Sequence, residues 1–485
     1  MNRELRRVSV LVLAMFLALF TSTTIIQVVE QDNLRADGRN VRTLYASFSA
    51  ERGPILVGGT PIAESVPAND LFKFQRVYPQ GELYSAVTGY FTLNQGTTGI
   101  EGELNDYLSG TANQQFLDRL TAIVTGQNPK GASVTVTIDP KVQKVAWDAL
   151  GKLQGAVVAF VPQTGKILAL VSKPTFDPNV LAVHDTSQVI AAYKKLLADP
   201  ADPLINRAIG GKLNPPGSTF KLVVASAALA SGQYTPSSRL PNPASLRLPQ
   251  SDTVITNAEG GRCGGGLTVT IADALRFSCN IPFAELGLKL GWDAISEQAK
   301  KYGFENLSIQ IPMTVTPSVF PPVDSEAQLM LQSFGQGNDR VSPMQMAMVS
   351  AAIGNGGVLM RPNLVEKITA PDLSILQAFA PSTFGTAVSP EVAASMTTMM
   401  IANVASGAAS NARIDGVDVA GKTGTAQNGE GEPYTLWFTG FAPAVDPQVA
   451  VAVVVENGGG LGQSGFGNTV AAPIAKKVIE AVLNR

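Results

Sequence analysis

One apolar segment near the N-terminus constrains this chain more than any other feature, because it decides where the remaining residues lie relative to a membrane. Residues 8–29 are apolar with few interruptions, and three arginines precede them, Arg3, Arg6 and Arg7. A helix needs about 20 such residues to cross the hydrocarbon core of a bilayer. Positive charge before a span predicts that this end stays in the cytoplasm. The sequence therefore predicts a single-pass anchor in the cell membrane, with everything after residue 30 outside the cytoplasm.

A cleaved signal sequence is the alternative interpretation of this segment. The apolar part of a signal peptide has about 7–15 residues, and a motif of small residues for cleavage follows it. This segment is longer, and no clear cleavage motif follows it in the sequence. Both interpretations place the bulk of the chain outside the cytoplasm, and we expect the uncleaved anchor.

Composition excludes several classes of protein. The 485 residues include 36 Lys and Arg against 38 Asp and Glu, a net charge of −2, so we expect no nucleic-acid partner. The single histidine, His184, cannot supply the paired imidazoles of most zinc enzymes, and two cysteines cannot form a four-thiolate metal site. We expect no metal and no cofactor, and we interpret His184 as a surface residue without a role. Proton transfer would then use Lys, Ser, Tyr or carboxylate groups.

Hydrophobic patterning predicts an α+β architecture. Alternating or continuous apolar runs bounded by turn residues indicate strands at residues 133–138, 155–161, 166–172, 417–426, 435–441 and 449–456. Helical spacing indicates helices at residues 140–153 and 469–485, and the long stretch between the two groups of strands is mostly helical. We expect short strands and turns over residues 31–131. One sheet assembled from both ends of a domain, with helices between, is typical of an α+β fold.

A candidate nucleophile lies at the start of a predicted apolar helix. The Pro-Pro-Gly turn at residues 215–217 places Ser218 at the N-terminus of a helix that is apolar on nearly all sides, which predicts burial. Lys221 follows three residues later and projects from the same face. Burial lowers the pKa of a lysine, and a neutral lysine beside a serine hydroxyl is a plausible base. The alternative is a serine that caps the helix and a lysine on the surface.

A second segment, Ser278-Cys279-Asn280, follows a predicted helix at residues 269–277. Residues two apart on an extended turn point the same way, so the hydroxyl and the amide could face one cleft. A bare Ser-x-Asn is common, however, and indicates little by itself.

The third segment, Lys422-Thr423-Gly424-Thr425, is unusual for a structural strand. Glycine weakens the packing of a strand and is used where a ligand or another backbone approaches closely. An edge strand of this kind could pair with an extended peptide while Lys422 and Thr425 bind the carboxylate of that peptide. The alternative is a polar edge strand without a ligand.

In this order, the three segments resemble the Ser-x-x-Lys, Ser-x-Asn and Lys-Thr-Gly motifs of the penicillin-binding proteins and serine β-lactamases. Other segments are similar to landmarks of the transpeptidase domain, at residues 206–208, 335–337, 341–347 and 437–443. Residues 52–55 and 99–110 resemble the N-terminal pedestal of the class B, monofunctional high-molecular-weight penicillin-binding proteins. Residues 31–154 are too short for the glycosyltransferase domain of a class A enzyme.

This resemblance implies three parts. Residues 1–30 would be the cytoplasmic tip and transmembrane anchor, residues 31–140 a β-rich pedestal domain, and residues 141–485 the transpeptidase domain. The transpeptidase domain would have the penicillin-binding and serine β-lactamase type of fold, with an antiparallel sheet between helical layers.

The resemblance also implies a D,D-transpeptidase that cross-links peptidoglycan in growth or division. Ser218 would attack the penultimate D-Ala carbonyl of a stem peptide, and Lys221, kept neutral by burial and by Lys422, would take its proton. Ser278 would relay a proton to the leaving amine, and the N–H groups of Ser218 and Thr425 would form an oxyanion hole.

Substrate binding is implied in the same way. The residues that would bind substrate, through its amide and its terminal carboxylate, are Asn280, Thr423, Gly424 and Thr425. The partners would be peptidoglycan stem peptides, β-lactam antibiotics, which imitate D-Ala-D-Ala, and a membrane glycan polymerase of the cell-wall machinery.

The oxidising compartment outside the cytoplasm favours a disulfide between Cys263 and Cys279. Closing a loop of about 15 residues would stabilise the fold by roughly 3 kcal/mol in the chain-entropy description. Two buried free thiols are the alternative. In either case we expect the Cys279 side chain to point away from those of Ser278 and Asn280.

Two other functions use the same motifs. A penicillin-hydrolysing or penicillin-sensing relative would share the acylation machinery, but a β-lactamase is commonly one compact domain without a pedestal or an anchor. A catalytically idle scaffold is disfavoured because Ser218, Lys221 and Lys422 are all present.

Overall fold

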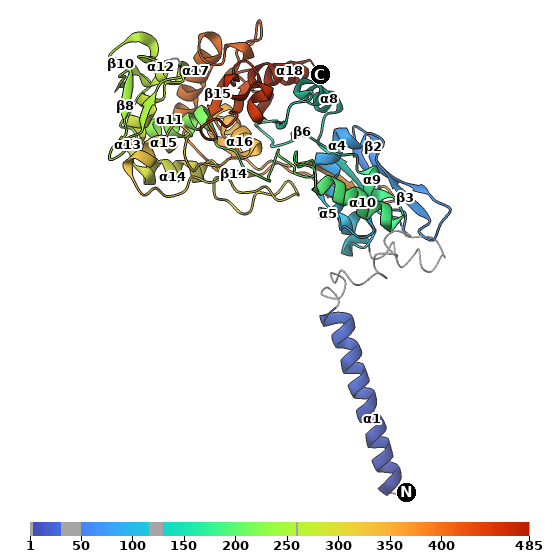
Figure 1. Ribbon diagram of the computed structural model, residues 1–485. Coiled ribbons are helices and arrows are strands. Elements are labelled where there is room, and N and C mark those ends of the chain that lie inside the picture. The colour runs from blue at the N-terminus through green and yellow to red at the C-terminus, as the bar shows by residue number, and fades with distance from the viewer. Residues whose placement is uncertain (1–2, 31–49, 116–129, 259, 485) are drawn as a thin grey trace.

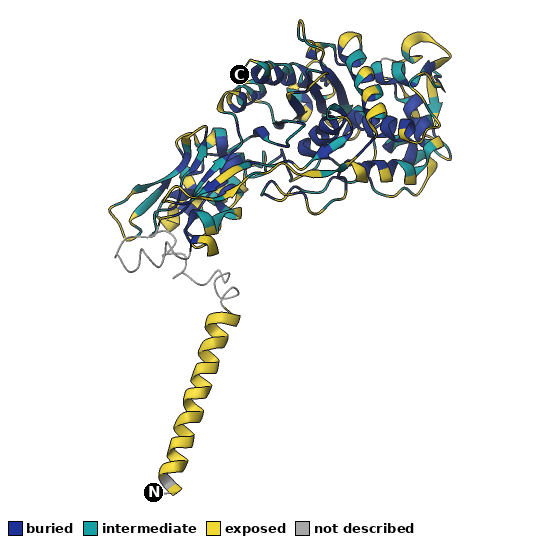
Figure 2. Cartoon of the chain, turned by 180° about the vertical axis from the view of Figure 1, so that it is seen from behind, coloured by how far each residue is buried: buried dark blue, intermediate teal, exposed yellow. Residues whose placement is uncertain are grey.

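The structure is a computed structural model that describes residues 3–30, 50–115, 130–258 and 260–484. Its first helix, α1 (Arg3–Thr24), continues as a π-helical turn, η1 (Ile25–Val29). The segment Leu5–Val29 is long and apolar enough to cross a membrane, and it buries no surface against other residues. Figure 2 shows this helix exposed along its whole length. The predicted apolar segment at residues 8–29 thus lies within one helix.

The C-terminal region is built on a five-stranded antiparallel sheet in the order β15-β16-β17-β5-β6 (Figure 1). Its strands are β5 (Gly155–Phe160), β6 (Ile167–Lys173), β15 (Ala420–Ala426), β16 (Thr435–Ala442) and β17 (Val449–Val455). Every residue of β5, β6, β16 and β17 is buried, since helices cover both faces of the sheet. The predicted strands are confirmed, and β15 lies at an edge.

Helices form a layer on each side of this sheet. On one face lie α8 (Pro140–Leu150) and α18 (Ala471–Leu483), and on the other lies α16 (Pro343–Gly354). The helix α17 (Pro390–Ser406) packs against β15, and α11 (Lys221–Ala230) packs among α13 (Ile281–Leu290), α14 (Trp292–Lys301) and α17. Several of these helices start at an Asp or Ser cap followed by proline, which satisfies the free N–H groups of the first turn.

The stretch between the two groups of strands is less helical than predicted. Besides the helices above it contains α9 (Asn179–Ala182), α10 (Thr186–Leu197), α12 (Ile271–Arg276) and α15 (Glu326–Gln332). It also contains short strands that pair two by two: β7 (Arg239–Pro241) with β10 (Thr268–Thr270), β8 (Ser245–Arg247) with β9 (Val254–Thr256), and β11 (Val358–Met360) with β14 (Thr383–Thr386). Strands this short carry no readable alternation of apolar residues.

A second, six-stranded sheet forms the N-terminal region, in the order β13-β12-β4-β1-β2-β3. Its strands are β1 (Ile55–Val57), β2 (Thr60–Pro67), β3 (Phe74–Val77), β4 (Ser133–Val136), β12 (Val365–Thr369) and β13 (Ile375–Ala378). Short helices accompany it in the described residues, among them α4 (Gly81–Thr88), α5 (Gly99–Glu103) and α6 (Asn105–Leu108). The sequence predicted only strands and turns here, because these helices are too short to show an apolar face. Two strands of the sheet, β12 and β13, come from residues assigned to the transpeptidase domain.

The interpretation of His184 as a surface residue is wrong. Its side chain is 11% exposed and pairs with Asp70 in the loop between β2 and β3. Its ring lies 4.7 Å, between centroids, from that of Phe72. The segment between α9 and α10 is covered by a hairpin distant in the sequence, which no local pattern predicts.

Candidate active site

Ser218 lies on a short turn that contacts two strands of the central sheet. This turn is the 3₁₀ helix η3 (Gly217–Phe220), which leads directly into α11. The Trp437 indole on β16 donates to the Pro215 carbonyl (2.9 Å). Gly217 has φ +53°, and a Cβ there would come within 2.9 Å of the Thr425 backbone. Glycine is therefore required for the turn to approach β15, and the approach fixes Ser218 beside the edge strand.

Lys221 lies one turn after Ser218 and is completely buried. Its Nζ contacts Ser218 Oγ (3.0 Å), the Ser278 carbonyl oxygen (2.7 Å) and Asn280 Oδ1 (2.8 Å). Burial, followed by the positive charge of Lys422, holds the pKa of Lys221 well below its usual value. The lysine amine is therefore able to accept a proton at a pH where a surface lysine could not.

Lys422 on β15 is also completely buried and lies on the far side of Ser278. Its Nζ donates to Ser278 Oγ (2.7 Å) and to the Thr423 carbonyl oxygen (2.9 Å). Burial lowers the pKa of Lys422 to about 7. The structure thus brings the three motifs together around Ser278. Its carbonyl contacts the amine of Lys221, and its hydroxyl contacts the amine of Lys422.

The turn that carries Ser278 and Asn280 is not extended, as the sequence interpretation assumed. Ser278 has φ +59°, a left-handed conformation, and Asn280 is helical at φ −85° and ψ −52°. The two side chains nevertheless face the same site, because each contacts a different lysine. The left-handed residue ends α12 and allows α13 to begin immediately.

The residues of β15 differ in what their side chains can still bind. The Thr423 hydroxyl donates to the Ala408 carbonyl (2.9 Å). The Thr425 hydroxyl instead accepts from the Gly467 N–H (3.2 Å), so its hydrogen can still be donated to a ligand. A Cβ at Gly424 would lie 2.7 Å from the Pro216 carbonyl oxygen. Gly424 was predicted to allow the close approach of a ligand or of another backbone. In the structure it is the backbone of the turn before Ser218 that packs closely against it.

Two further landmarks hold this turn in place. The Gly217 N–H donates to the Gly335 carbonyl (2.9 Å), and Gln336 contacts the Thr425 carbonyl at 3.5 Å. Arg207 Nε lies 3.1 Å from Glu456 Oε2, and the other oxygen of Glu456 accepts from the Asn214 side chain (3.0 Å). The contacts of Asn214 and Gly217 support the chain just before Ser218, and that of Gln336 supports the facing strand β15.

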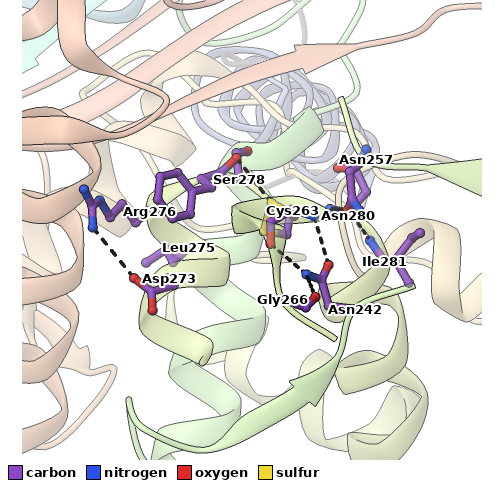
Figure 3. The surroundings of a disulfide bond; sticks show 12 residues. Asn242, Asn257, Cys263, Gly266, Asp273, Leu275, Arg276, Ser278, Asn280 and Ile281 are labelled. Carbon is purple, nitrogen blue, oxygen red and sulfur yellow. Dashed lines mark hydrogen bonds and ion pairs between the residues drawn. A yellow bond between two sulfur atoms is a disulfide. The ribbon is translucent and has the colours of Figure 1, made fainter. Parts of the chain in front are cut away.

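Cys263 and Cys279 are joined by a disulfide, with a Cα–Cα distance of 5.7 Å. Cys279 is fully buried and bonded to a neighbouring loop, whereas the side chains of Ser278 and Asn280 extend toward the lysines. Figure 3 shows the surroundings of this bond.

Asn257 was not identified from the sequence. Its Oδ1 accepts from the N–H groups of Asn280 (2.9 Å) and Ile281 (3.2 Å). It lies in an irregular loop without a motif, so no sequence signal pointed to it. Across the described ranges, no three His, Cys, Asp or Glu side chains come close enough to hold a metal ion.

The chain matches two protein families. Residues 155–480 match the penicillin binding protein transpeptidase domain, and residues 52–134 match the penicillin binding protein A dimerisation domain.

Individual proteins match over its whole length. The chain is 42% identical to the peptidoglycan D,D-transpeptidase PbpA of Mycolicibacterium smegmatis, over 100% of this chain and 99% of that protein. The structure of the ceftriaxone acyl-enzyme complex of penicillin-binding protein A from M. tuberculosis superimposes with a TM-score of 0.87 at 40% identity, covering 90% of this chain and 100% of that one. Pseudomonas aeruginosa PBP2 superimposes with a TM-score of 0.73 at 29% identity, covering 89% and 95%.

Proposed function

The chain belongs to the penicillin-binding protein transpeptidase family, and on that premise we propose that it cross-links peptidoglycan stem peptides as a D,D-transpeptidase with Ser218 as its nucleophile. The membership agrees with the resemblance to class B enzymes, and within them to penicillin-binding protein A, that the motifs indicated. One observation carries the proposal. Two buried lysine amines flank Ser278, and the amine of Lys221 also contacts Ser218 Oγ.

In the acylation step, Ser218 Oγ attacks the carbonyl carbon of the penultimate D-Ala. Its proton passes to the Lys221 amine across the 3.0 Å contact, and an ester forms while the peptide C–N bond breaks. The depressed pKa of Lys221 supports its role as the base.

The leaving D-Ala amine needs a proton as the C–N bond breaks. We propose that Ser278 Oγ supplies it and is reprotonated by Lys422, whose Nζ lies 2.7 Å away. A pKa of Lys422 of about 7 supports proton donation near neutral pH. The amine of a second stem peptide then attacks the ester, forms the cross-link and releases Ser218.

The developing oxyanion would be bound by the N–H groups of Ser218 and Thr425. The closeness of the Ser218 turn to the Thr425 backbone supports this pairing, because both groups belong to one narrow seam between η3 and β15. One such donor is typically worth about 2.7–4 kcal/mol in the transition state.

Substrate recognition is proposed for Asn280, Thr423, Gly424 and Thr425. Asn280 would hold the substrate amide, and the hydroxyls of β15 would donate to the terminal carboxylate. Of these two hydroxyls, that of Thr425 is the better donor to the carboxylate, because the Thr423 hydroxyl already donates its hydrogen to the Ala408 carbonyl. Gly424 would contribute through close backbone packing rather than through direct contact with the ligand.

The location and partners follow from the same premise. We propose a three-part chain, with an anchor at residues 1–30, a pedestal at 31–140 and a transpeptidase domain at 141–485. The family matches at residues 52–134 and 155–480 support this division, although β12 and β13 cross it. The arginines before α1 support a cytoplasmic tip and an extracytoplasmic catalytic domain. A membrane glycan polymerase is the partner we propose.

Mass spectrometry of the full-length protein after penicillin treatment, followed over hours, tests this function. A lasting adduct on Ser218 that is absent from Ser218→Ala is the expected result. Rapid loss of the adduct would indicate hydrolysis of β-lactams instead, and failure to form any adduct would indicate a scaffold.

A further inference from the structure

Ser278 is held in a backbone conformation that it would not adopt by itself. Its φ of +59° lies in the left-handed region, which costs a residue with a side chain roughly 1–2 kcal/mol. Such a residue persists only where its surroundings hold it in place. Both its hydroxyl and its carbonyl contact the lysine amines, so whatever holds this turn also sets the geometry of the site.

Asn257 contacts the turn from outside the three motifs (Figure 3). The residue is 4% exposed, and its Oδ1 accepts from two successive backbone N–H groups, those of Asn280 and Ile281. Its Nδ2 donates to the Gly261 carbonyl (3.0 Å). The neighbouring Thr256 carbonyl accepts from the Asn280 side chain (3.0 Å). Residues 256 and 257 therefore hold Asn280 by both its backbone and its amide.

The disulfide does not replace this contact. It joins the side chain of Cys279 to the same loop, but it offers no acceptor to the N–H groups at the start of α13. A buried N–H without an acceptor costs about 1–3 kcal/mol, so those two groups would move toward another acceptor if Asn257 were truncated. Asn280 would move with them, and its Oδ1 would leave its position 2.8 Å from Lys221 Nζ.

We propose that Asn257 is a positioning residue for the transpeptidase reaction. It acts through Asn280 and Ser278, and it sets the distances of both to Lys221 without a contact of its own to the reacting groups. This inference rests on the proposed function of Ser218 and Lys221.

Asn242, which lies between β7 and β8, provides a matched control because its side chain binds the same loop. It is equally buried, and it makes three hydrogen bonds of similar length, to the Cys263 carbonyl (2.7 Å), the Gly266 carbonyl (2.9 Å) and the Cys263 N–H (3.2 Å). Figure 3 shows these bonds between Asn242 and the loop that carries Cys263 and Gly266. Truncation of Asn242 therefore removes comparable support from the loop without touching residues 278–281.

The experiment compares Asn257→Ala, Asn257→Asp and Asn242→Ala in the full-length protein, by the rate of acylation with a fluorescent penicillin at increasing concentration. We expect Asn257→Ala to lower the maximal acylation rate by about 10–100-fold, since a displacement of about 1 Å has effects of that size. The concentration for half-saturation should change little. Asn257→Asp should recover most of the rate, because a carboxylate oxygen accepts from both N–H groups.

Asn242→Ala should lose thermal stability to a similar degree but keep its acylation rate within about threefold. Equal slowing of Asn242→Ala and Asn257→Ala, or no recovery in Asn257→Asp, would overturn the inference. If Asn257→Ala does not fold, Asn257→Ser, whose shorter side chain cannot reach both N–H groups, takes its place with the same expectations. A wild-type protein that forms no adduct would overturn the proposed function instead, so the two failures are distinguishable.

Discussion

Two buried charge clusters, one in each region of this molecule, are built in opposite ways. In the N-terminal region, Glu101 lies between Arg52 (2.5 Å) and Arg76 (2.6 Å), and all three side chains are almost completely buried. In the active site, Lys221 and Lys422 are equally buried, but the hydrogen bonds of their Nζ atoms go to hydroxyl, carbonyl and amide oxygens. Within the described part of the chain, neither lysine forms an ion pair.

The difference shows how one chain can use burial for two purposes. Burial by itself would raise the pKa of Glu101, but Arg76 and Arg52 together outweigh it and hold that pKa below its usual value. Burial lowers the pKa of both lysines, and no acid offsets it. Paired charges therefore stay ionised and structural, whereas the two unpaired lysines bind their protons less tightly than a surface lysine and can take part in proton transfer.

The largest effect should come from removing the buried amine next to Ser218. Lys221→Met removes the proposed base, and general-base catalysis typically contributes about 10²–10⁴-fold, so we expect acylation by a fluorescent penicillin to fall about 10³-fold. The free energy of unfolding in urea should stay the same or increase, because an apolar side chain replaces a buried amine that has no acid beside it. Retained acylation, or a strongly destabilised protein, would break the comparison.

The paired cluster should show the opposite behaviour. Glu101→Gln leaves two buried guanidinium groups without their carboxylate, and breaking a buried pair in this way costs about 3–5 kcal/mol. We expect that loss in the free energy of unfolding, with the acylation rate of the folded protein unchanged. Glu103→Gln, on the same helix but exposed, is the control and should have little effect on stability. A slowed acylation in Glu101→Gln would mean that the pedestal cluster also serves the active site.

Two threonines, Thr423 and Thr425, follow Lys422 on β15, and variants of them test how the site binds a carboxylate. Thr425→Val should weaken the capture of a peptide or β-lactam carboxylate by about 10-fold or more, as expected for one hydrogen bond to a charged group. Thr423→Val should change it less, because that hydroxyl already donates to Ala408. Concentrations for half-maximal acylation measure both effects. Equal losses in the two variants would show that Thr423 rotates toward the ligand.

The smallest effect concerns pH. The pKa of Lys422 is about 7 in the folded protein, against a usual value of 10.5. Between pH 7 and pH 10.5, Lys422 is therefore protonated in the unfolded chain but mostly neutral in the folded protein. Stability therefore rises with pH in this range, by about 1 kcal/mol between pH 7 and 8, and this increment should vanish in Lys422→Met. Glu101 has the opposite sign, since its lowered pKa means stability that is lost as the pH falls below about 4.5. Urea unfolding at a series of pH values measures both.

Much of the C-terminal region could be predicted from local patterns. The strand β17 is apolar along its whole length and β16 is mostly apolar, and α8, α16 and α17 begin with a cap followed by proline. That β12 and β13 join the six-stranded sheet of the N-terminal region could not be predicted, because pairing between strands distant in the sequence produces no local sequence pattern. For the same reason, the packing of Asp70 and Phe72 against His184 was not predicted.

The active-site motifs were found because they are short and contiguous, but their geometry was not. The left-handed Ser278, the engaged hydroxyl of Thr423 and the contact of Gly424 with Pro216 all depend on neighbours that fold in from elsewhere. Asn257 carries no motif, and only its position beside residues 280 and 281 gives it importance.

The sequence by itself determined an apolar N-terminal segment, an α+β fold and three motifs in a fixed order. Each of these can be recognised from the types and spacing of residues that are close together in the sequence. Only the tertiary structure decided that Lys221 and Lys422 are both buried around Ser278, and that Glu101 is buried between two arginines. Lysine and arginine look alike in a list of charges. Their pKa values, and with them their functions, depend on which atoms surround them after the chain has folded.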